Sequence, residues 1–355
     1  MTKLDPLPLA QIQAAAARIR DHHRRTPTLE WTQRPALPGL PPQTQVLLKL
    51  EQLQLGGSFK LRGALNALLA GPAPPPAGVF TASGGNHGIG VALAAQQLCV
   101  PCTVFLPTSA PQRSEERLLQ LGARVVRAGA AWDHAYQHAS TAAAAVGGRL
   151  VHPFDDPLVI AGQGTLALEL LEDHPQVDLL LVAVGGGGLL GGTSTVLRAQ
   201  PRPRRVGGVG ALGSSSMAAS AEQGQVVRLP EVRTIATTLA PLSVSPLTLQ
   251  LCQERSSGLC CVSDDQMRAA MALLWDDLRL QVEPAGAAAL AALLFGAAPP
   301  AWLVDVRSVA VLLCGANASA RPVLSCADRS FSPGLAPLRA SGPSQLSSVT
   351  RERTP

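Results

Sequence analysis

The feature that most constrains the fold is an apolar run at residues 179–184 that passes directly into four glycines, Gly185, Gly186, Gly187 and Gly188. A short run without a polar residue is typical of a strand buried on both faces. Helix-period patterns separate it from similar apolar runs at residues 46–51, 78–82, 102–106, 123–127 and 309–313. This alternation predicts an α/β fold with parallel-type sheets covered by helices.

The length of the chain, 355 residues, is large for one hydrophobic core, so we predict two lobes. The proline-rich residues 71–78 separate two of the apolar blocks. We predict a large lobe from residues 1–72 and 151–330 and a small lobe from residues 73–150. Residues 331–355 are rich in Ser, Pro and Arg without periodicity, which predicts a disordered tail.

Composition argues against nucleic-acid and membrane partners. The formal net charge is +5, but the basic residues are dispersed and aromatic residues make up only 3%. Nucleic-acid surfaces use clustered positive charge and often stacking rings. The sequence has no uninterrupted apolar run of about 18 residues, and its first residues lack an apolar signal region. We therefore expect a cytoplasmic protein that binds neither nucleic acid nor membrane.

The seven cysteines form an odd and irregularly spaced set, which indicates free thiols in a reducing compartment. Cys99 and Cys102 have the spacing of a redox pair. They fall between an alanine-rich helical pattern and an apolar strand, where two packed thiols are the simpler interpretation. His134 and His138, with Asp133 nearby, have a spacing that can bind zinc. Without an evident third ligand, a polar helix face explains them better.

Lysine is rare and therefore informative, because only Lys3, Lys49 and Lys60 stand among 29 basic residues. Arginine cannot form an imine, since its guanidinium does not deprotonate in proteins. Lys60 opens a predicted helix after a Gly-Gly-Ser-Phe sequence, and the positive end of a helix dipole favours a free amine. A solvated surface lysine is the alternative interpretation on this evidence alone.

Two glycine loops follow predicted strands. Residues 83–88, Ser-Gly-Gly-Asn-His-Gly, precede a helical pattern, so their backbone N–H groups could hold a carboxylate. Residues 185–188 could wrap a phosphate. Their glycine spacing also matches a dinucleotide fingerprint, which needs an acidic residue about twenty positions later. Because no Asp or Glu lies between Asp178 and Glu222, a smaller phosphate is preferred.

Together these residues resemble the fold-type II pyridoxal-phosphate enzymes, in the threonine/serine dehydratase and serine racemase family. The resemblance extends from about Ile12 to Asn317. The motifs that carry it are, in order, GGSFKLRGALN, ASGGNHG, HPFDDPLVIAGQGTLALE, VGGGGLLGG, VEPAGAAAL and LLCGANAS. Each motif is moderately specific, and their order makes the resemblance strong.

The resemblance implies a two-lobed fold whose large lobe binds pyridoxal 5'-phosphate. Lys60 would be the catalytic residue that carries the cofactor as a Schiff base. The implied cofactor-binding residues are Phe59 beside the ring, Asn86 at the ring 3-hydroxyl, Gly185, Gly186, Gly187 and Gly188 at the phosphate, and Cys314 at the pyridine nitrogen. The implied substrate-binding residues are Ser83, Gly84, Gly85, Asn86 and His87. Glu283 falls in a family motif and would line the pocket.

Three positions depart from the family pattern. Cys314 stands where serine is usual, and a thiol is a weak donor. Residues 207–216 contain no carboxylate, although relatives bind a divalent cation through acidic residues there, so we expect no metal. In serine racemase a serine follows the first residue of the asparagine loop, whereas this chain has Gly84. Because glycine cannot deliver a proton to the second face of the substrate, we expect elimination to dominate over racemisation.

The function implied is a dehydratase, or ammonia-lyase, that converts L-threonine or L-serine into a 2-oxo acid and ammonia. The alternatives are an amino-acid racemase, a 3-hydroxyaspartate dehydratase, and a binding protein of the same fold without turnover. The expected partner is a small amino-acid substrate, and we expect a homo-oligomer, in the simplest case a dimer.

Overall fold

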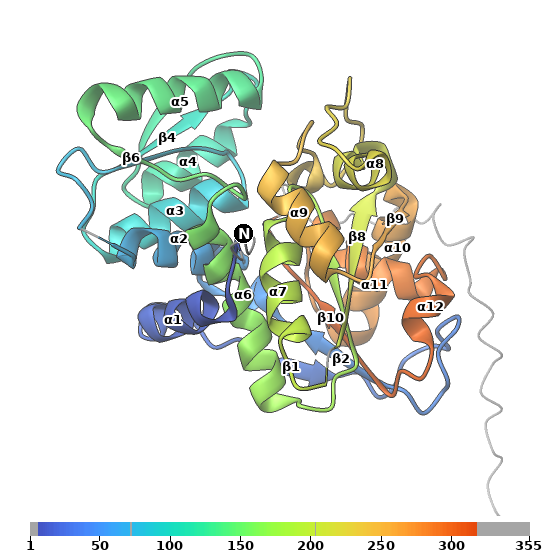
Figure 1. The fold of residues 1–355 in the computed structure, drawn as a ribbon. Helices are drawn as coiled ribbons and strands as arrows, with labels where there is room; N and C mark the ends of the chain where they lie inside the picture. Colours follow the sequence, from blue (N-terminus) through green and yellow to red (C-terminus); the bar gives the residue numbers. More distant parts are fainter. Residues whose placement is uncertain (1–5, 72, 203, 318–355) are drawn as a thin grey trace, which may run out of the picture. The chain divides into compact units, whose positions relative to one another are not determined.

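The computed structural model describes residues 6–71, 73–202 and 204–317, which are built around two sheets (Figure 1). The larger sheet has the strand order β1-β2-β10-β7-β8-β9. Only β1 is antiparallel to its neighbour, and the other pairings are parallel. The strands are β1 (Thr28–Glu30), β2 (Gln45–Lys49), β7 (Leu179–Ala183), β8 (Arg205–Ala211), β9 (Leu259–Val262) and β10 (Ser308–Leu312).

The second sheet has the order β5-β4-β3-β6 and is parallel throughout. Its strands are β3 (Val79–Ala82), β4 (Cys102–Leu106), β5 (Arg124–Arg127) and β6 (Arg149–Leu150). Its sequence includes the helices α3 (Asn86–Gln97), α4 (Gln112–Gln120) and α5 (Trp132–Val146). The parallel sheets and covering helices confirm the predicted α/β fold.

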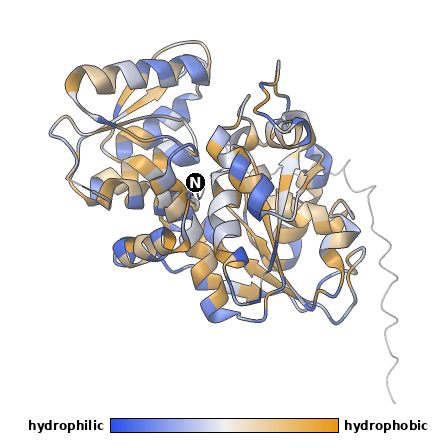
Figure 2. Ribbon diagram, viewed as in Figure 1, coloured by the Kyte–Doolittle hydropathy of each residue, from blue (hydrophilic) through white to orange (hydrophobic). Residues whose placement is uncertain are grey.

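The remaining helices belong to the rest of the described chain. They are α1 (Leu9–Ile19), α2 (Lys60–Leu69), α6 (Pro157–Asp173), α7 (Gly188–Arg198), α8 (Ser216–Gln223), α9 (Pro246–Arg255), α10 (Asp264–Leu278), α11 (Pro284–Leu294) and α12 (Pro300–Leu303). Helix α6 packs against α1, α2 and α7. Figure 2 shows apolar residues concentrated along the central strands of the larger sheet, where β7 and β10 are buried at every position.

The sequence located most of the buried strands and missed the short ones. The runs predicted at residues 102–106 and 179–184 correspond to β4 and β7, and the run at 46–51 ends two residues early, at Lys49. Strands β1, β6, β8 and β9 were not predicted. Strands β1, β6 and β9 have two to four residues and are partly exposed, so they lack the apolar run that marks a buried strand. Strand β8 is buried, but three of its seven residues are glycines, which interrupt its apolar run.

The described residues all belong to one compact unit, Met1–Pro322. Within it, every strand of the smaller sheet falls in the range predicted for the small lobe, residues 73–150. The division into lobes at residues 72 and 151 stays a prediction. The tail predicted at residues 331–355 lies outside the described residues.

A group of buried charges joins β2, α2 and α6. We call Lys49, Glu51, Arg62 and Glu169 the ionic cluster. The Arg62 guanidinium donates to both Glu51 oxygens at 2.9 and 2.7 Å and to both Glu169 oxygens at 2.7 and 2.8 Å. The Lys49 amine donates to Glu169 Oε2 at 3.2 Å and to the Thr26 carbonyl at 2.7 Å. Two cations thus face two carboxylates inside the fold, which is how buried charges are tolerated.

Candidate active site

Lys60 is the first residue of α2, as the sequence predicted. Its amine donates to the Pro153 carbonyl at 2.9 Å and lies 5.2 Å from the centre of the Phe59 ring. Among the described residues it has no ion pair. Burial lowers the pKa of Lys60 from 10.5 to about 8, although the nearby acids Cys314 and Glu283 act in the opposite direction. The amine therefore has an appreciable uncharged, nucleophilic fraction near neutral pH.

The asparagine loop, residues 83–88, connects β3 to α3. The Ser83 hydroxyl accepts a hydrogen bond from the Gly85 N–H at 3.2 Å, so this side chain holds the loop in shape. A Cβ on Gly85 would lie 3.6 Å from Thr238, and a Cβ on Gly84 would lie 3.4 Å from Leu106. Both are ordinary contact distances, so the loop has room at these two positions.

Asn86 lies at the start of α3 and is buried. Its Nδ2 donates to Glu283 Oε1 at 2.7 Å, and its Oδ1 accepts from Asn317 Nδ2 at 2.8 Å. Thr238 donates to the same Glu283 oxygen at 3.0 Å. Burial raises the pKa of Glu283, although hydrogen bonds from Thr238 and Asn86 act in the opposite direction. The structure thus places Glu283, a weak candidate from its motif, directly on the asparagine loop.

His87 is buried, and its Nε2 lies 3.2 Å from the Val151 carbonyl. That contact assigns the ring proton to Nε2, because a carbonyl only accepts. Its Nδ1 is buried without a hydrogen-bond partner among the described residues. Burial lowers the pKa of His87, and the nearby Lys60 adds to this effect. A neutral His87 therefore connects the asparagine loop to Val151 through one ring nitrogen.

The glycine loop lies between β7 and α7, which begins at Gly188. A Cβ on Gly186 would lie 2.3 Å from the Phe154 ring, and one on Gly187 would lie 2.3 Å from Met217 Cε. Gly187 also has a φ of 90°, which L side chains rarely adopt. These positions therefore require glycine, and they leave a stretch of bare backbone whose N–H groups precede a helix.

Cys314 follows β10 and is buried. Its thiol donates to the Ala285 carbonyl at 3.5 Å, and its own carbonyl accepts from the Phe59 N–H at 3.2 Å. Burial raises the pKa of the Cys314 thiol far above its usual value. Because the Cys314 carbonyl is hydrogen-bonded to Phe59, the residue before Lys60, Cys314 and Lys60 lie close together although they are far apart in sequence.

Several residues that contact the loops and side chains of the site were not predicted from the sequence. They are Trp132, Tyr136, Pro153, Phe154, Thr238 and Asn317, together with His152. His152, Pro153 and Phe154 belong to the HPFDDP motif, which was noticed only as a mark of the family. That motif was the available signal, whereas nothing in the sequence linked Trp132 to the site.

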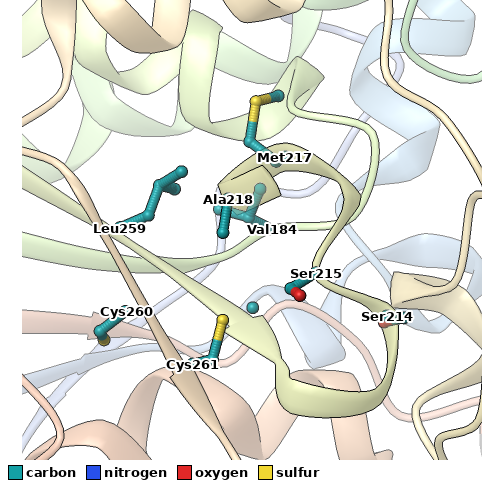
Figure 3. A pocket seen from close by; sticks show the side chains of 9 residues that line it. Val184, Ser214, Ser215, Met217, Ala218, Leu259, Cys260 and Cys261 are labelled. Carbon is teal, nitrogen blue, oxygen red and sulfur yellow. The ribbon is translucent and has the colours of Figure 1, made fainter. Parts of the chain in front are cut away.

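The stretch without carboxylates, residues 207–216, forms part of β8 and the short turn Leu212–Ser214. Figure 3 shows a small pocket beside it, lined by Val184, Gly210, Ser214, Ser215, Met217, Ala218, Leu259, Cys260 and Cys261. None of these side chains offers the charged oxygen that Mg²⁺ or Ca²⁺ prefers. In the described ranges, no group of three or more His, Cys, Asp or Glu side chains is arranged to hold a metal ion.

The weaker candidates form neither a metal site nor a disulfide in the described part of the chain. His134 and His138 are exposed on α5, while Asp133 pairs with Arg228, as a polar helix face would. Cys102 is buried, and burial raises its pKa to about 12, but Cys99 is exposed. The expectation of two packed thiols was therefore wrong for Cys99. Both cysteines are free.

The residues around Lys60 fit a cofactor that carries an aldehyde and a phosphate. Burial lowers the pKa of Lys60, which favours the uncharged amine that forms an imine. The glycine loop is kept free of side chains by close packing against Phe154 and Met217. Asn86 Nδ2 carries two hydrogens and uses one for Glu283, which leaves the other for a ring oxygen.

The known proteins that are similar to this chain agree with one another. A family model described as "Pyridoxal-phosphate dependent enzyme" matches residues 19–315. An L-threonine ammonia-lyase from Geobacter sulfurreducens is 39% identical over 289 residues, which cover 81% of this chain and 71% of that protein. A phenylserine dehydratase from Ralstonia pickettii is 38% identical over 327 residues, covering 90% of this chain and 97% of that protein.

A solved structure of maize serine racemase superposes with a TM-score of 0.81 at 28% sequence identity. The superposition covers 88% of this chain and 94% of that structure. In the part of the chain that the structure describes, no helix is both long enough and apolar enough to span a bilayer.

Proposed function

Because this chain belongs to the family of pyridoxal-phosphate dependent enzymes, we propose that it is an ammonia-lyase that converts L-threonine or L-serine into a 2-oxo acid and ammonia. The similarity to an L-threonine ammonia-lyase supports this reaction. The observation that carries the proposal is the position of the Lys60 amine, which donates to the Pro153 carbonyl, has no ion pair among the described residues and lies among groups suited to the cofactor. A relative named phenylserine dehydratase adds 3-phenylserine to the candidate substrates.

The proposed roles follow from the positions of the side chains. Lys60 would hold the cofactor, Gly185 to Gly188 its phosphate, and Asn86 its ring oxygen. When bound there, pyridoxal phosphate supplies an electron sink that makes the proton on the substrate Cα removable. The Lys60 amine would take this proton as general base, and its pKa near 8 suits the task at neutral pH.

The substrate carboxylate would lie against the backbone N–H groups of the asparagine loop. The loop is fixed at both ends, by Ser83 on the Gly85 N–H and by the bond between Asn86 and Glu283. Neutral His87 donates to Val151 and so adds no second cation beside Lys60. Departure of the β-hydroxyl as water then leaves an enamine that hydrolyses to the 2-oxo acid and ammonia.

Elimination is favoured over racemisation by Gly84. Racemisation needs a proton donor on the face of the substrate opposite Lys60, and glycine has no side chain to serve there. Ser83 is the nearest hydroxyl in sequence, but its oxygen accepts the Gly85 N–H. A cytoplasmic location and a homodimer, both expected from sequence, stay predictions that cell fractionation and gel filtration of the holoenzyme would test.

The experiment is a product analysis of the purified holoenzyme with L-serine and L-threonine. We expect 2-oxo acid and ammonia in equal amounts, little D-isomer, and the same rate after exhaustive chelation. D-serine formed as fast as pyruvate would overturn the preference for elimination. A holoenzyme that binds these amino acids without releasing ammonia would support the binding-protein alternative instead. Gly84→Ser should raise the D-serine fraction, because a Cβ at this position meets only ordinary contacts.

A further inference from the structure

Four rings form a connected set that includes both neighbours of Pro153, whose carbonyl accepts from the Lys60 amine. We call Trp132, Tyr136, His152 and Phe154 the aromatic wall. Trp132 and Tyr136 stack, with ring centres 5.2 Å apart and planes at 16°. His152 meets the other three rings edge-on, at 6.0 Å from Trp132, 5.0 Å from Tyr136 and 4.7 Å from Phe154. The chain has six Phe, four Trp and one Tyr, so this set uses its only tyrosine.

The aromatic wall contacts three parts of the site. Trp132 Nε1 donates to the Ala82 carbonyl at 2.8 Å, directly before the asparagine loop. The Pro153 carbonyl, between His152 and Phe154, accepts from the Lys60 amine at 2.9 Å. Phe154 packs so closely on the glycine loop that a Cβ on Gly186 would collide with its ring. The wall therefore extends from the proposed carboxylate site, past the catalytic amine, to the proposed phosphate site.

The surface of the aromatic wall is apolar and carries no positive charge near pH 7. All four side chains are half-buried, so each keeps some exposed surface, although Tyr136 also packs against the apolar cluster of the smaller sheet. Burial lowers the pKa of His152 to about 4, which keeps its ring neutral. Burial also raises the pKa of Tyr136, and the nearby carboxylates Asp155 and Asp156 add to this effect. Such surroundings repel an anionic substituent and accept an uncharged ring.

We infer that the aromatic wall binds the β substituent of the substrate and that this substituent is an aromatic ring. The preferred substrate would then be a 3-aryl-serine such as L-threo-3-phenylserine, rather than threonine or 3-hydroxyaspartate. This inference rests on the proposed function and names the substrate class for it. In the reaction the Cα–H and Cβ–O bonds break and water leaves. A second water then hydrolyses the imine, so phenylserine gives phenylpyruvate and ammonia without an oxidant.

The test compares ammonia release by the holoenzyme from L-threo-3-phenylserine, L-threonine and L-serine. We expect kcat/KM for phenylserine to exceed that for threonine by about tenfold, the effect of one well-placed aromatic contact. L-Phenylalanine, which lacks the leaving hydroxyl, should inhibit more strongly than L-2-aminobutyrate. Turnover of threonine without a gain for phenylserine overturns the inference and leaves the proposed function intact. No ammonia from any of the three substrates overturns the proposed function itself.

A variant separates recognition from a structural role of the rings. Tyr136→Leu should lower kcat/KM for phenylserine about threefold to tenfold more than it lowers kcat/KM for serine. Trp275→Leu is the matched control, since Trp275 is an exposed ring on α10. It should leave the ratio of the two substrates unchanged. Equal losses for both substrates in Tyr136→Leu would mean that the wall only supports the fold and would overturn the inference.

Discussion

The ionic cluster and the Lys60 site show two ways of placing a lysine inside one protein. Lys49 is fully buried and donates to Glu169 and to a backbone carbonyl. Lys60 is only half-buried and donates to a carbonyl alone. Burial lowers the pKa of both lysines, and at Lys49 the carboxylates of Glu169 and Glu51 oppose it. A counter-charge thus makes a lysine structural, whereas its absence leaves an amine free to react.

Of the two lysines, only Lys60 should react with the cofactor. Lys60→Ala should lower ammonia release by about 10²-fold to 10⁴-fold or more, because the variant loses both the cofactor attachment and the general base. Borohydride treatment of the wild-type holoenzyme should fix pyridoxal phosphate to the peptide that contains Lys60. Cofactor fixed to the Lys49 peptide, or full activity in Lys60→Ala, would contradict the assignment.

The ionic cluster should contribute to the stability of the fold. Glu169→Gln should lower the free energy of unfolding by about 3–5 kcal/mol, because Arg62 and Lys49 lose a buried counter-charge. Glu172→Gln is the control, since Glu172 lies on the same helix and pairs with Arg25 at the surface. It should cost about 1 kcal/mol or less. Urea unfolding of the cofactor-free protein measures the free energy of unfolding of both variants. If Glu169→Gln costs as little as Glu172→Gln, the ionic cluster does not stabilise the fold.

The pH dependence of cofactor attachment should reflect the lowered pKa of Lys60. Only the uncharged amine attacks an aldehyde, so the attachment rate should fall as pH falls through the pKa of Lys60, about 8. We expect a decrease of about tenfold for each pH unit well below that value and a plateau above it. Stopped-flow absorbance of cofactor-free protein mixed with pyridoxal phosphate measures the profile. A rate that still rises steeply above pH 9 would mean an ordinary lysine.

The smallest expected effect concerns Cys314, whose thiol lies close to Lys60 but forms no hydrogen bond with it. Cys314→Ser replaces a weak donor with a stronger one and should change kcat by about fivefold or less. Cys102→Ser, at a buried thiol of the other sheet, should leave kcat unchanged. A hundredfold change in Cys314→Ser would show that the thiol has a larger role in the site than a weak hydrogen-bond donor has.

The two regions also differ in how well the sequence predicted them. Lys60 and the glycine loops were predicted from the sequence. Lysine is rare in this chain, and consecutive glycines indicate a backbone that must stay free of side chains. The ionic cluster was missed, since Glu51, Arg62 and Glu169 are separated in sequence and charged residues usually lie at the surface. Trp132 and Tyr136 were missed for a related reason. Their helix periodicity indicates an amphipathic helix and not what lies opposite its first turn.

The strand order has a consequence for how this protein matures. Strand β10, near the end of the described chain, lies in the middle of the larger sheet between β2 and β7. The Asn317 side chain donates to the carbonyl of Gly56, which lies 261 residues earlier in the chain. Until β10 has left the ribosome, β2 and β7 have unpaired edges open to other chains. We therefore expect the nascent protein to depend on chaperones and to acquire its cofactor only after synthesis is complete.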